Sequence, residues 1–214
     1  MKFYKILYFF IPIVFLATIL FWFLDNGYSR SNYYGGGTIF YTIINKGECN
    51  LKIDGDINEA LERSFSDLVK ESVYSGCKSY QLTLNSSGGN LGIALFLGNL
   101  IRDKKMTTVV LDRCKSACLY LFISGVNRVA SKNSVLGVHQ AIDSESKECI
   151  NPKLRTKSNM DFFNGLLEFS QEMLGDKSGK FFISKENIAG CKEMLQVDNA
   201  EFLKEGVINK LIED

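Results

Sequence analysis

Segments typical of strands alternate with segments typical of helices through the middle of the chain, and this alternation restricts the fold more than any other feature. Residues 79–84 alternate apolar and polar side chains, as a strand does, and a glycine-containing turn leads into a helical pattern over 91–102. The same order repeats with a strand over 107–111 and a helix over 116–124. Strands joined through helices pair in parallel by right-handed crossovers. The sequence therefore predicts an α/β domain with a parallel sheet.

Shorter patterns predict further elements on both sides of this region. Asp54 and Asp56 interrupt an early strand, where turn and helix-cap chemistry explains them better than a cation site does. Asp198 has the residue type and position of a helix N-cap, and Gly206 marks the end of the same helix. The domain is expected to extend over residues 38–214. Its further strands are predicted over 38–44, 49–53, around 129, 134–138, 194–197 and 207–212, and its further helices over 58–73, 158–174 and 199–205.

The N-terminal segment predicts a membrane anchor. After Lys2 and Lys5, residues 6–24 carry no charge. About 19 residues at about 1.5 Å each nearly cross a hydrocarbon core of about 30 Å. Because positive residues stay on the cytoplasmic side, residues 1–5 are expected to be cytoplasmic and 6–24 to form one transmembrane helix. The domain is then expected on the far side of the membrane, anchored by a single pass.

Residues 25–37 are polar and end in three consecutive glycines, which predicts a flexible tether between the anchor and the domain. A cleaved signal peptide is the alternative to an anchor, because Ser29 and Ser31 are small and suitably spaced for a cleavage site. An uncleaved anchor is preferred, since the uncharged run is longer than the apolar core of a typical secretory signal.

Charge and motif content narrow the possible partners. The formal net charge of +1 gives no electrostatic reason to expect nucleic acid as a partner. The sequence contains no nucleotide-binding loop, so an ATP-driven unfoldase would have to be another protein. No cofactor is implied by the motifs.

The six cysteines fit an oxidising compartment, where an even number is usually paired. Six cysteines allow 15 connectivities, so the pairing does not follow from the sequence. Cys114 and Cys118 flank Ser116 at a spacing that a disulfide can bridge if a helix begins there. Two buried thiols packing a tight turn explain the spacing equally well. A metal site is less plausible, since the chain has one histidine and no second close cysteine pair.

Three places in the sequence contain the candidate catalytic residues: SSGG at 86–89, a serine at 116 and the only histidine, at 139. A serine hydroxyl becomes nucleophilic when a base removes its proton, and the resulting oxyanion needs preorganised donors. Ser116 follows a strand and begins a helix, and His139 is the only imidazole available as its base. Glycines at 88 and 89 allow backbone amides to approach a ligand closely. The backbone N–H groups of Gly89 and Ala117 are therefore the expected oxyanion donors.

Each of these residues also has an ordinary structural explanation. A serine at a helix start is usually an N-cap, a single histidine at a strand end is usually structural, and two glycines after a strand are common in turns. The order and spacing of all three strings together favour catalysis.

Five motifs occur in order along the chain: GDI at 55–57, LTLNSSGG at 82–89, SA at 116–117, SVLGVHQ at 134–140 and AEFLKEGVI at 200–208. This order resembles that of the Clp protease proteolytic subunit, within the Clp/crotonase superfamily, over roughly residues 51–211. The flanking cysteines and the anchor resemble a periplasmic, membrane-anchored branch, which implies a single-pass inner-membrane protein with its domain in the periplasm. The resemblance implies a (ββα)n spiral domain, a homo-oligomer, Ser116 as the nucleophile and His139 as the base. The long helix at 158–174 corresponds to the packing region of such oligomers.

The family's orienting aspartate is missing at the matching position. That residue lies four positions before the cap of the penultimate helix, and counting back from Asp198 leads to Met194. Glu193 is one residue away, and a strand bulge would bring it toward His139 as a third catalytic member. The sequence thus supports a Ser116–His139 pair and leaves the triad open.

The expected function is a membrane-anchored serine peptidase-like hydrolase that acts on extended peptides outside the cytoplasm. The substrate peptide is expected to bind by strand addition beside the Gly-Gly loop. The missing aspartate favours the alternative, a catalytically inactive relative that binds peptides or scaffolds an assembly at the membrane. A coenzyme-A-thioester enzyme of the crotonase type is a third alternative, disfavoured because its substrates are as a rule cytoplasmic.

Overall fold

The computed structural model describes residues 29–45, 47–142, 149–150 and 157–213. The predicted cytoplasmic segment 1–5 and membrane span 6–24 lie outside these residues. No helix in the described ranges is both long and apolar enough to cross a membrane.

The described residues form one sheet, in which hydrogen-bonded neighbouring strands follow the order β1-β2-β3-β4-β5-β6-β9. Strands β1, β2 and β3 pair antiparallel, whereas β3, β4, β5, β6 and β9 pair in parallel, as the alternation predicts. The strands are β1 (Ser29–Tyr33), β2 (Gly37–Asn45), β3 (Glu48–Gly55), β4 (Ser79–Ser86), β5 (Thr107–Lys115), β6 (Asn127–Ser131), β7 (Val135–Val138), β8 (Leu195–Gln196) and β9 (Lys210–Ile212).

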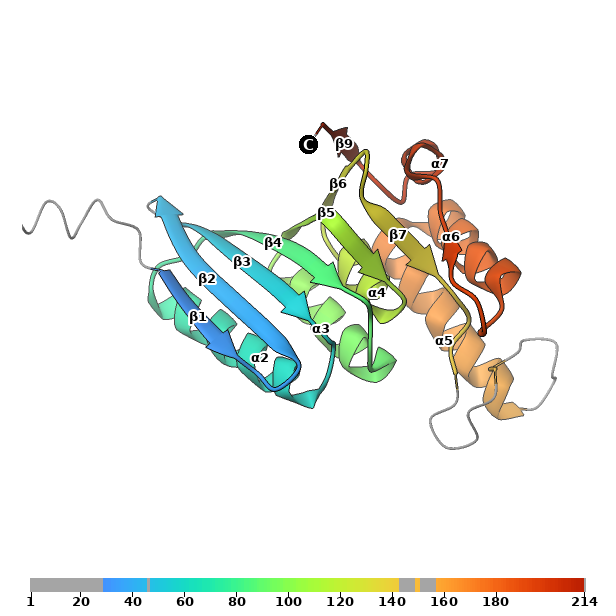
Figure 1. Ribbon diagram of the computed structural model, residues 1–214, viewed down its shortest axis with the longest axis horizontal. Helices are drawn as coiled ribbons and strands as arrows, with labels where there is room; N and C mark the ends of the chain where they lie inside the picture. Colours follow the sequence, from blue (N-terminus) through green and yellow to red (C-terminus); the bar gives the residue numbers. More distant parts are fainter. Residues whose placement is uncertain (1–28, 46, 143–148, 151–156, 214) are drawn as a thin grey trace, which may run out of the picture.

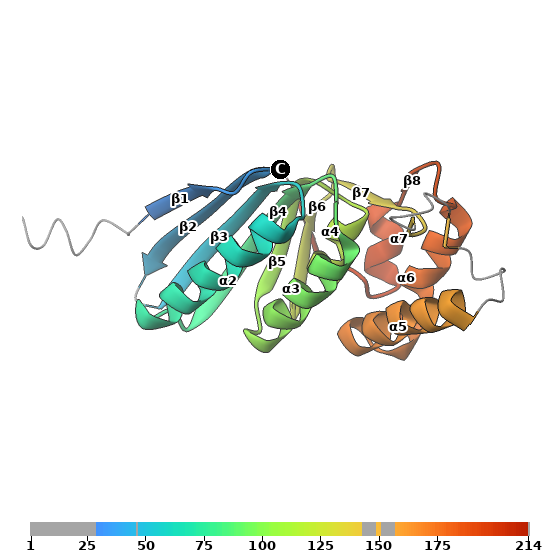
Figure 2. The same cartoon turned by 90° about the horizontal axis from the view of Figure 1, so that it is seen from below.

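The helices cover one face of this sheet and gather at its far end. Figures 1 and 2 show α2 and α3 along the face of the sheet, and α5, α6 and α7 together near β7 and β8. The helices are α2 (Glu59–Tyr74), α3 (Leu91–Asp103), α4 (Ala117–Ile123), α5 (Lys157–Leu174), α6 (Asp176–Ala189) and α7 (Asn199–Lys204).

Local signals explain where several helices begin. The side chain of Asn58 accepts a hydrogen bond from the backbone N–H of Leu61 and so caps α2. Asp198 accepts one from the backbone N–H of Ala200, which confirms its predicted role as the cap of α7. Asp54 accepts a hydrogen bond from Asn85, and the described residues contain no acidic, His or Cys cluster arranged to hold a metal ion.

Strand β5 changes partner along its length, and this change positions the candidate site. Its first half, 107–110, pairs with β6, and its second half, 113–115, pairs with β7. Both pairings are parallel, so the carboxyl ends of β5 and β7 reach the same edge. The residues that follow the two strands therefore lie side by side.

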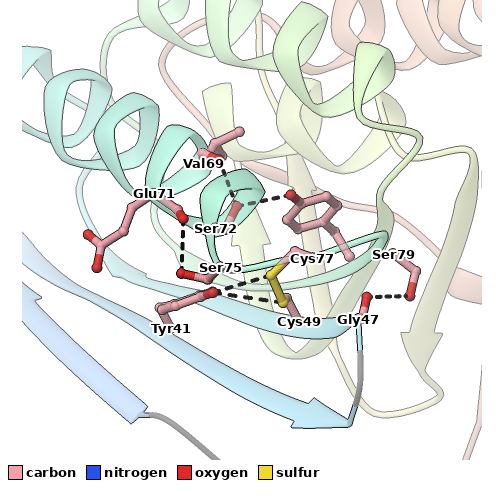
Figure 3. Close-up of a disulfide and its surroundings, with 10 residues drawn as sticks. Tyr41, Gly47, Cys49, Val69, Glu71, Ser72, Ser75, Cys77 and Ser79 are labelled. Atoms are coloured by element: carbon pink, nitrogen blue, oxygen red, sulfur yellow. Dashed lines mark hydrogen bonds between the residues drawn. A yellow bond between two sulfur atoms is a disulfide. The ribbon is translucent and has the colours of Figure 1, made fainter.

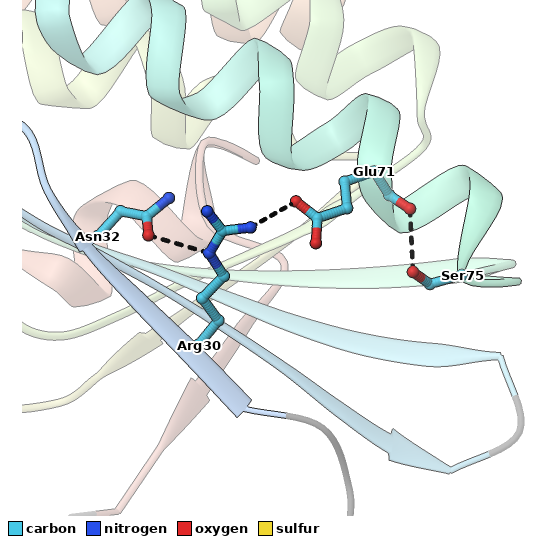
Figure 4. Close-up of polar contacts among 4 residues, drawn as sticks. All are labelled: Arg30, Asn32, Glu71 and Ser75. Carbon is cyan, nitrogen blue, oxygen red and sulfur yellow. Dashed lines mark hydrogen bonds and ion pairs between the residues drawn. The ribbon is translucent and has the colours of Figure 1, made fainter.

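The prediction of a flexible tether over 25–37 is wrong for residues 29–33, which form strand β1. This strand pairs with β2 in register from Ser29 to Tyr33. Arg30 forms an ion pair with Glu71 of α2 at 2.8 Å, and its Nε donates a hydrogen bond to Oδ1 of Asn32 (Figure 4). Strand β1 lies at the edge of the sheet and most of its side chains are exposed, so polar residues are tolerated there. A polar edge strand therefore resembles a linker in sequence.

A disulfide joins the start of β3 to the segment that follows α2. Cys49 pairs with Cys77, and the hydroxyl of Tyr41 on β2 contacts both sulfurs (Figure 3). Ser72 of α2 bonds to the Tyr80 hydroxyl close by, at 3.0 Å. These contacts hold α2 against β2, β3 and β4 at the end of the sheet away from the candidate site.

Helix α6 is absent from the sequence-based prediction. It follows α5 after Gly175, which has a positive φ of 86°. Phe162, Phe163 and Phe169 of α5 are partly buried against the core, so they do not form a fully exposed aromatic surface. Helix α6 packs against α5.

Candidate active site

The register of two parallel strands brings Ser116 beside His139. Lys115 of β5 pairs with Gly137 of β7, and the backbone N–H of Ser116 donates to the Gly137 carbonyl at 2.8 Å. His139 directly follows β7. The nucleophile and base predicted from sequence thus come together at one edge of the sheet.

Ser116 has a backbone conformation that few non-glycine residues adopt, with φ 54° and ψ −130°. It occupies the N-cap position of α4, yet its side chain forms no capping hydrogen bond. A sharp strand-to-helix turn of this kind presents a nucleophile to the solvent side of a sheet. The ordinary explanation of this serine as a helix cap therefore does not apply.

The hydrogen bonds of His139 determine its tautomer. Its Nδ1 lies 2.7 Å from the carbonyl oxygen of Gln140, and its Nε2 lies 2.7 Å from the Oγ of Ser116. Because a carbonyl can only accept, Nδ1 carries the proton of the neutral imidazole. Nε2 then has a free lone pair, and the Ser116 hydroxyl donates to it. This is the arrangement that general-base activation of a serine requires.

The structure does not place Glu193 as the third member. Glu193 is exposed, and Nδ1 of His139 is instead paired with the Gln140 carbonyl. Strand β8 pairs antiparallel with β7 through Val138 and Leu195, so continuing the register sets Met194 across from His139. No bulge shifts Glu193 into that position. A backbone carbonyl therefore takes the place in which the resemblance implies a carboxylate.

The glycine loop lies against Ser116. A Cβ on Gly88 would lie 2.7 Å from the Cβ of Ser116, so only glycine fits there. Ile57 donates to the Gly88 carbonyl and accepts from the N–H of Asn90. In this parallel bridge the N–H of Gly89 points away from Ile57. Gly89 and Ala117, the predicted oxyanion donors, both line the same cavity as Ser116.

Cys114 and Cys118 form a disulfide across the nucleophile turn, with their Cα atoms 5.2 Å apart. The first of the two explanations left open by the sequence is thus the one the structure adopts. The bond joins the end of β5 to the second residue of α4 and encloses Ser116. It restrains the turn whose backbone conformation is unfavourable for serine.

A cavity of about 650 Å³ opens beside Ser116 and His139. Two of its described lining residues, Tyr120 and Glu186, are nearly fully buried, with exposed fractions of 2% and 7%. The Tyr120 hydroxyl donates to Oε2 of Glu186 at 2.8 Å. Burial raises the pKa of Glu186 to about 8, against the smaller opposing effect of this hydrogen bond. The cavity wall therefore contains an acid that is largely protonated at neutral pH.

A backbone bond and a disulfide hold Glu186 in place relative to His139. The N–H of Gln140 donates to the carbonyl of Gly190, just after α6, at 2.7 Å. Cys149 and Cys191 form a disulfide between the loop after His139 and the same end of α6. The end of α6 that carries Glu186 is therefore attached to the chain that carries the base.

Sequence reasoning missed Glu186, although a signal is present. The buried positions of α6 are Gly179, Phe182, Ile183 and Glu186. They follow the i, i+3, i+4, i+7 spacing of a buried helix face, and an acid occupies the last of them. An acidic residue on an apolar face needs a partner or a purpose, and here it faces a cavity.

Comparisons with known proteins support the fold. No family model matches the sequence, and no curated protein matches it either. Among solved structures, ClpP1 from Listeria monocytogenes is 18% identical, with a TM-score of 0.58 over 77% of this chain and 91% of that one. A membrane-bound stomatin-specific protease is 15% identical, with a TM-score of 0.58 over 76% and 78%.

The ClpP protease catalytic domain from Plasmodium falciparum is also similar, at 15% identity and a TM-score of 0.56 over 74% of this chain and 82% of that one. Identities this low establish the fold and not the activity. The similarity agrees with the α/β architecture of the described chain. The chain therefore has the α/β fold of the Clp protease proteolytic subunits, as its motifs predicted.

Proposed function

We propose that this chain is a membrane-anchored serine peptidase-like hydrolase that acts on extended peptides outside the cytoplasm. The observation that carries the proposal is the 2.7 Å contact between Ser116 Oγ and His139 Nε2, made by a serine that does not cap its helix. A structural serine would satisfy its hydroxyl locally. This hydroxyl instead meets the lone pair of the only imidazole in the chain.

The geometry supports the following sequence of steps. Nε2 of His139 takes the hydroxyl proton as Ser116 Oγ attacks a peptide carbonyl, and the N–H groups of Gly89 and Ala117 stabilise the oxyanion. His139 then gives its Nε2 proton to the leaving amine. In the second half of the reaction His139 takes a proton from water as the water attacks the acyl-enzyme, and returns that proton to Ser116 Oγ as the acyl group leaves. The Gln140 carbonyl keeps its hydrogen bond from Nδ1 throughout and stabilises the imidazolium, although less than a carboxylate would.

A fluorophosphonate probe tests the nucleophile directly. The purified full-length chain is expected to be labelled at Ser116, and Ser116→Ala is expected to abolish the labelling. Ser75→Ala is the matched control, because Ser75 is exposed just after α2 and is not among the described residues that line the cavity. A folded wild-type protein that resists labelling would contradict the proposal.

A catalytically inactive peptide-binding or scaffolding protein is the second candidate. It is favoured by one observation, the absence of a carboxylate at Nδ1 of His139. It is disfavoured by the short distance between Ser116 and His139, which an inactive relative has no need to maintain. The labelling experiment separates the two, since only the hydrolase reacts with the probe.

The membrane and assembly parts of the proposal rest on other features. The uncharged run 6–24 supports an anchor, and the three disulfides, which pair all six cysteines, suit a domain outside the cytoplasm. One similar structure is named as a membrane-bound protease, and a homo-oligomer is proposed from the family resemblance. Carbonate extraction of membranes and the mass of the detergent-solubilised protein test these two points. Release of the protein by carbonate would overturn the membrane anchor, and a strictly monomeric mass would overturn the homo-oligomer.

A further inference from the structure

Glu186 is an acid without a basic partner, in the wall of the cavity beside the nucleophile. Its Oε2 accepts the hydrogen bond from Tyr120 at 2.8 Å, and no described residue donates to its Oε1. No described cation contributes to its electrostatic environment, which is set by burial and by Tyr120. A buried carboxylate is costly unless it is paired, so this acid would release its proton to solvent when a cationic group enters the cavity and pairs with it.

The position of Tyr120 relates this acid to the reacting atoms. Ser116 is the N-cap residue just before α4, and Tyr120 is the fourth residue of that helix. Ser116, Tyr120 and Glu186 all line the same cavity. A substrate residue whose carbonyl carbon sits at Ser116 Oγ can therefore place its side chain in the cavity that Tyr120 and Glu186 line.

The cavity suits a long side chain that is apolar along its stem and cationic at its end. Its walls include the partly buried apolar groups of Leu91 and Phe162, whereas the acid in the wall is buried. A short or branched apolar side chain would leave Oε1 of Glu186 unpaired. An ammonium or guanidinium group would pair with it, and Tyr120 would hold the second oxygen.

Glu186 is not arranged to orient the base. Nδ1 of His139 is already bonded to the Gln140 carbonyl, and Glu186 is bonded to Tyr120. Because it lines the cavity without contacting the base, its carboxyl is available for substrate selection.

From these contacts we propose that Glu186, held by Tyr120, forms the end of a subsite that selects lysine or arginine as the residue whose carbonyl Ser116 attacks. The proposal rests on the proposed function of Ser116 and adds to it a class of substrate.

Two peptidyl diphenyl phosphonates test the subsite, identical except that one carries lysine and the other norleucine at the position that enters it. Norleucine has the same straight stem without the ammonium group, so the comparison isolates the charge. Rates of inactivation of the full-length chain are expected to favour the lysine reagent by about tenfold or more. Glu186→Gln, which keeps the shape of the side chain, is expected to bring the ratio of the two rates close to one. Glu168→Gln on the exposed face of α5 makes the same change of charge and is expected to keep the ratio.

The outcomes separate this proposal from the one on which it rests. If the fluorophosphonate and both phosphonates fail to label folded protein, the hydrolase proposal fails. If the fluorophosphonate labels Ser116 and norleucine reacts as fast as lysine, or Glu186→Gln keeps the preference, only the subsite is overturned. The wild-type comparison requires no variant, so a failure of Glu186→Gln to fold would still leave the charge preference measured.

Discussion

At the scale of single residues, the site depends on what each neighbour of His139 can accept or donate. The Gln140 carbonyl selects the tautomer with its proton on Nδ1, which leaves Nε2 for Ser116. A carbonyl does this without a full negative charge, so in the proposed mechanism it would stabilise the imidazolium less than a carboxylate does. The rate of the Ser116–His139 pair is therefore expected to be limited by this missing charge.

The variant Met194→Asp is expected to increase the rate of fluorophosphonate labelling by about tenfold or more, since loss of the orienting carboxylate in a triad of another fold lowers kcat by about 10⁴. Met194 is 41% exposed and lies across from His139 in the extended β7–β8 register, so an aspartate there meets little desolvation cost. Met194→Asn is the matched control, with the same shape and no charge. Equal rates for the two variants would show that a carboxylate at this position does not reach Nδ1.

At the scale of secondary-structure elements, the change of partner along β5 and the disulfide that follows it hold the nucleophile turn. The second half of β5 pairs with β7, and the Cys114–Cys118 bond joins that half to α4. Ser116 lies between the two cysteines in a conformation that costs about 1 to 3 kcal/mol unless its surroundings maintain it. The strand pairing and the disulfide are the elements that maintain it.

Replacing both Cys114 and Cys118 with alanine is expected to slow labelling at Ser116 clearly while lowering the free energy of unfolding only modestly. The closed loop is short, so the chain-entropy contribution of the bond to the free energy of unfolding is about 2 kcal/mol. Removing the Cys49–Cys77 pair is the matched control. It closes a longer loop away from the site and contributes roughly 3 to 4 kcal/mol, so its loss is expected to lower the thermal midpoint further yet preserve the labelling rate. Equal slowing by both double variants would assign the effect to general destabilisation.

At the scale of the whole molecule, Glu186 couples folding to pH. Its pKa is raised from 4.5 to about 8 in the folded state, chiefly by burial, so the folded chain binds a proton that the unfolded chain releases. The free energy of unfolding therefore decreases as pH rises from about 5 to about 8, and this contribution levels off above the folded-state pKa.

Glu186→Gln is expected to remove this part of the pH dependence. Relative to the variant, the wild-type protein should lose a few kcal/mol of stability between pH 5 and pH 8, because each unit of pKa shift corresponds to about 1.4 kcal/mol. Chemical denaturation of both proteins at several pH values measures the difference. Parallel curves for the two proteins would mean that the acid is equally protonated in both states.

Much of the order of the elements could be predicted from the sequence, because it depends on short-range patterns, and the motifs named two residues, Ser116 and His139, that lie in contact. Alternation identified the parallel strands, and Asp198 and Gly206 marked the ends of α7 correctly. The motif order singled out Ser116 and His139, which the structure brings together. Strand β1 and helix α6 could not be predicted as readily, since a polar edge strand resembles a linker and an acid interrupts the apolar face of α6.

The sequence by itself determined which residues stand at the ends of the strands, since strand and turn preferences act over a few neighbouring residues. Only the tertiary structure decided what those residues meet. The β5–β7 and β7–β8 registers set Ser116 beside His139 and Met194, rather than Glu193, across from it. The packing of α6 set Glu186 in the cavity. Such contacts depend on strand register and helix packing between distant segments, which a one-dimensional spacing does not specify.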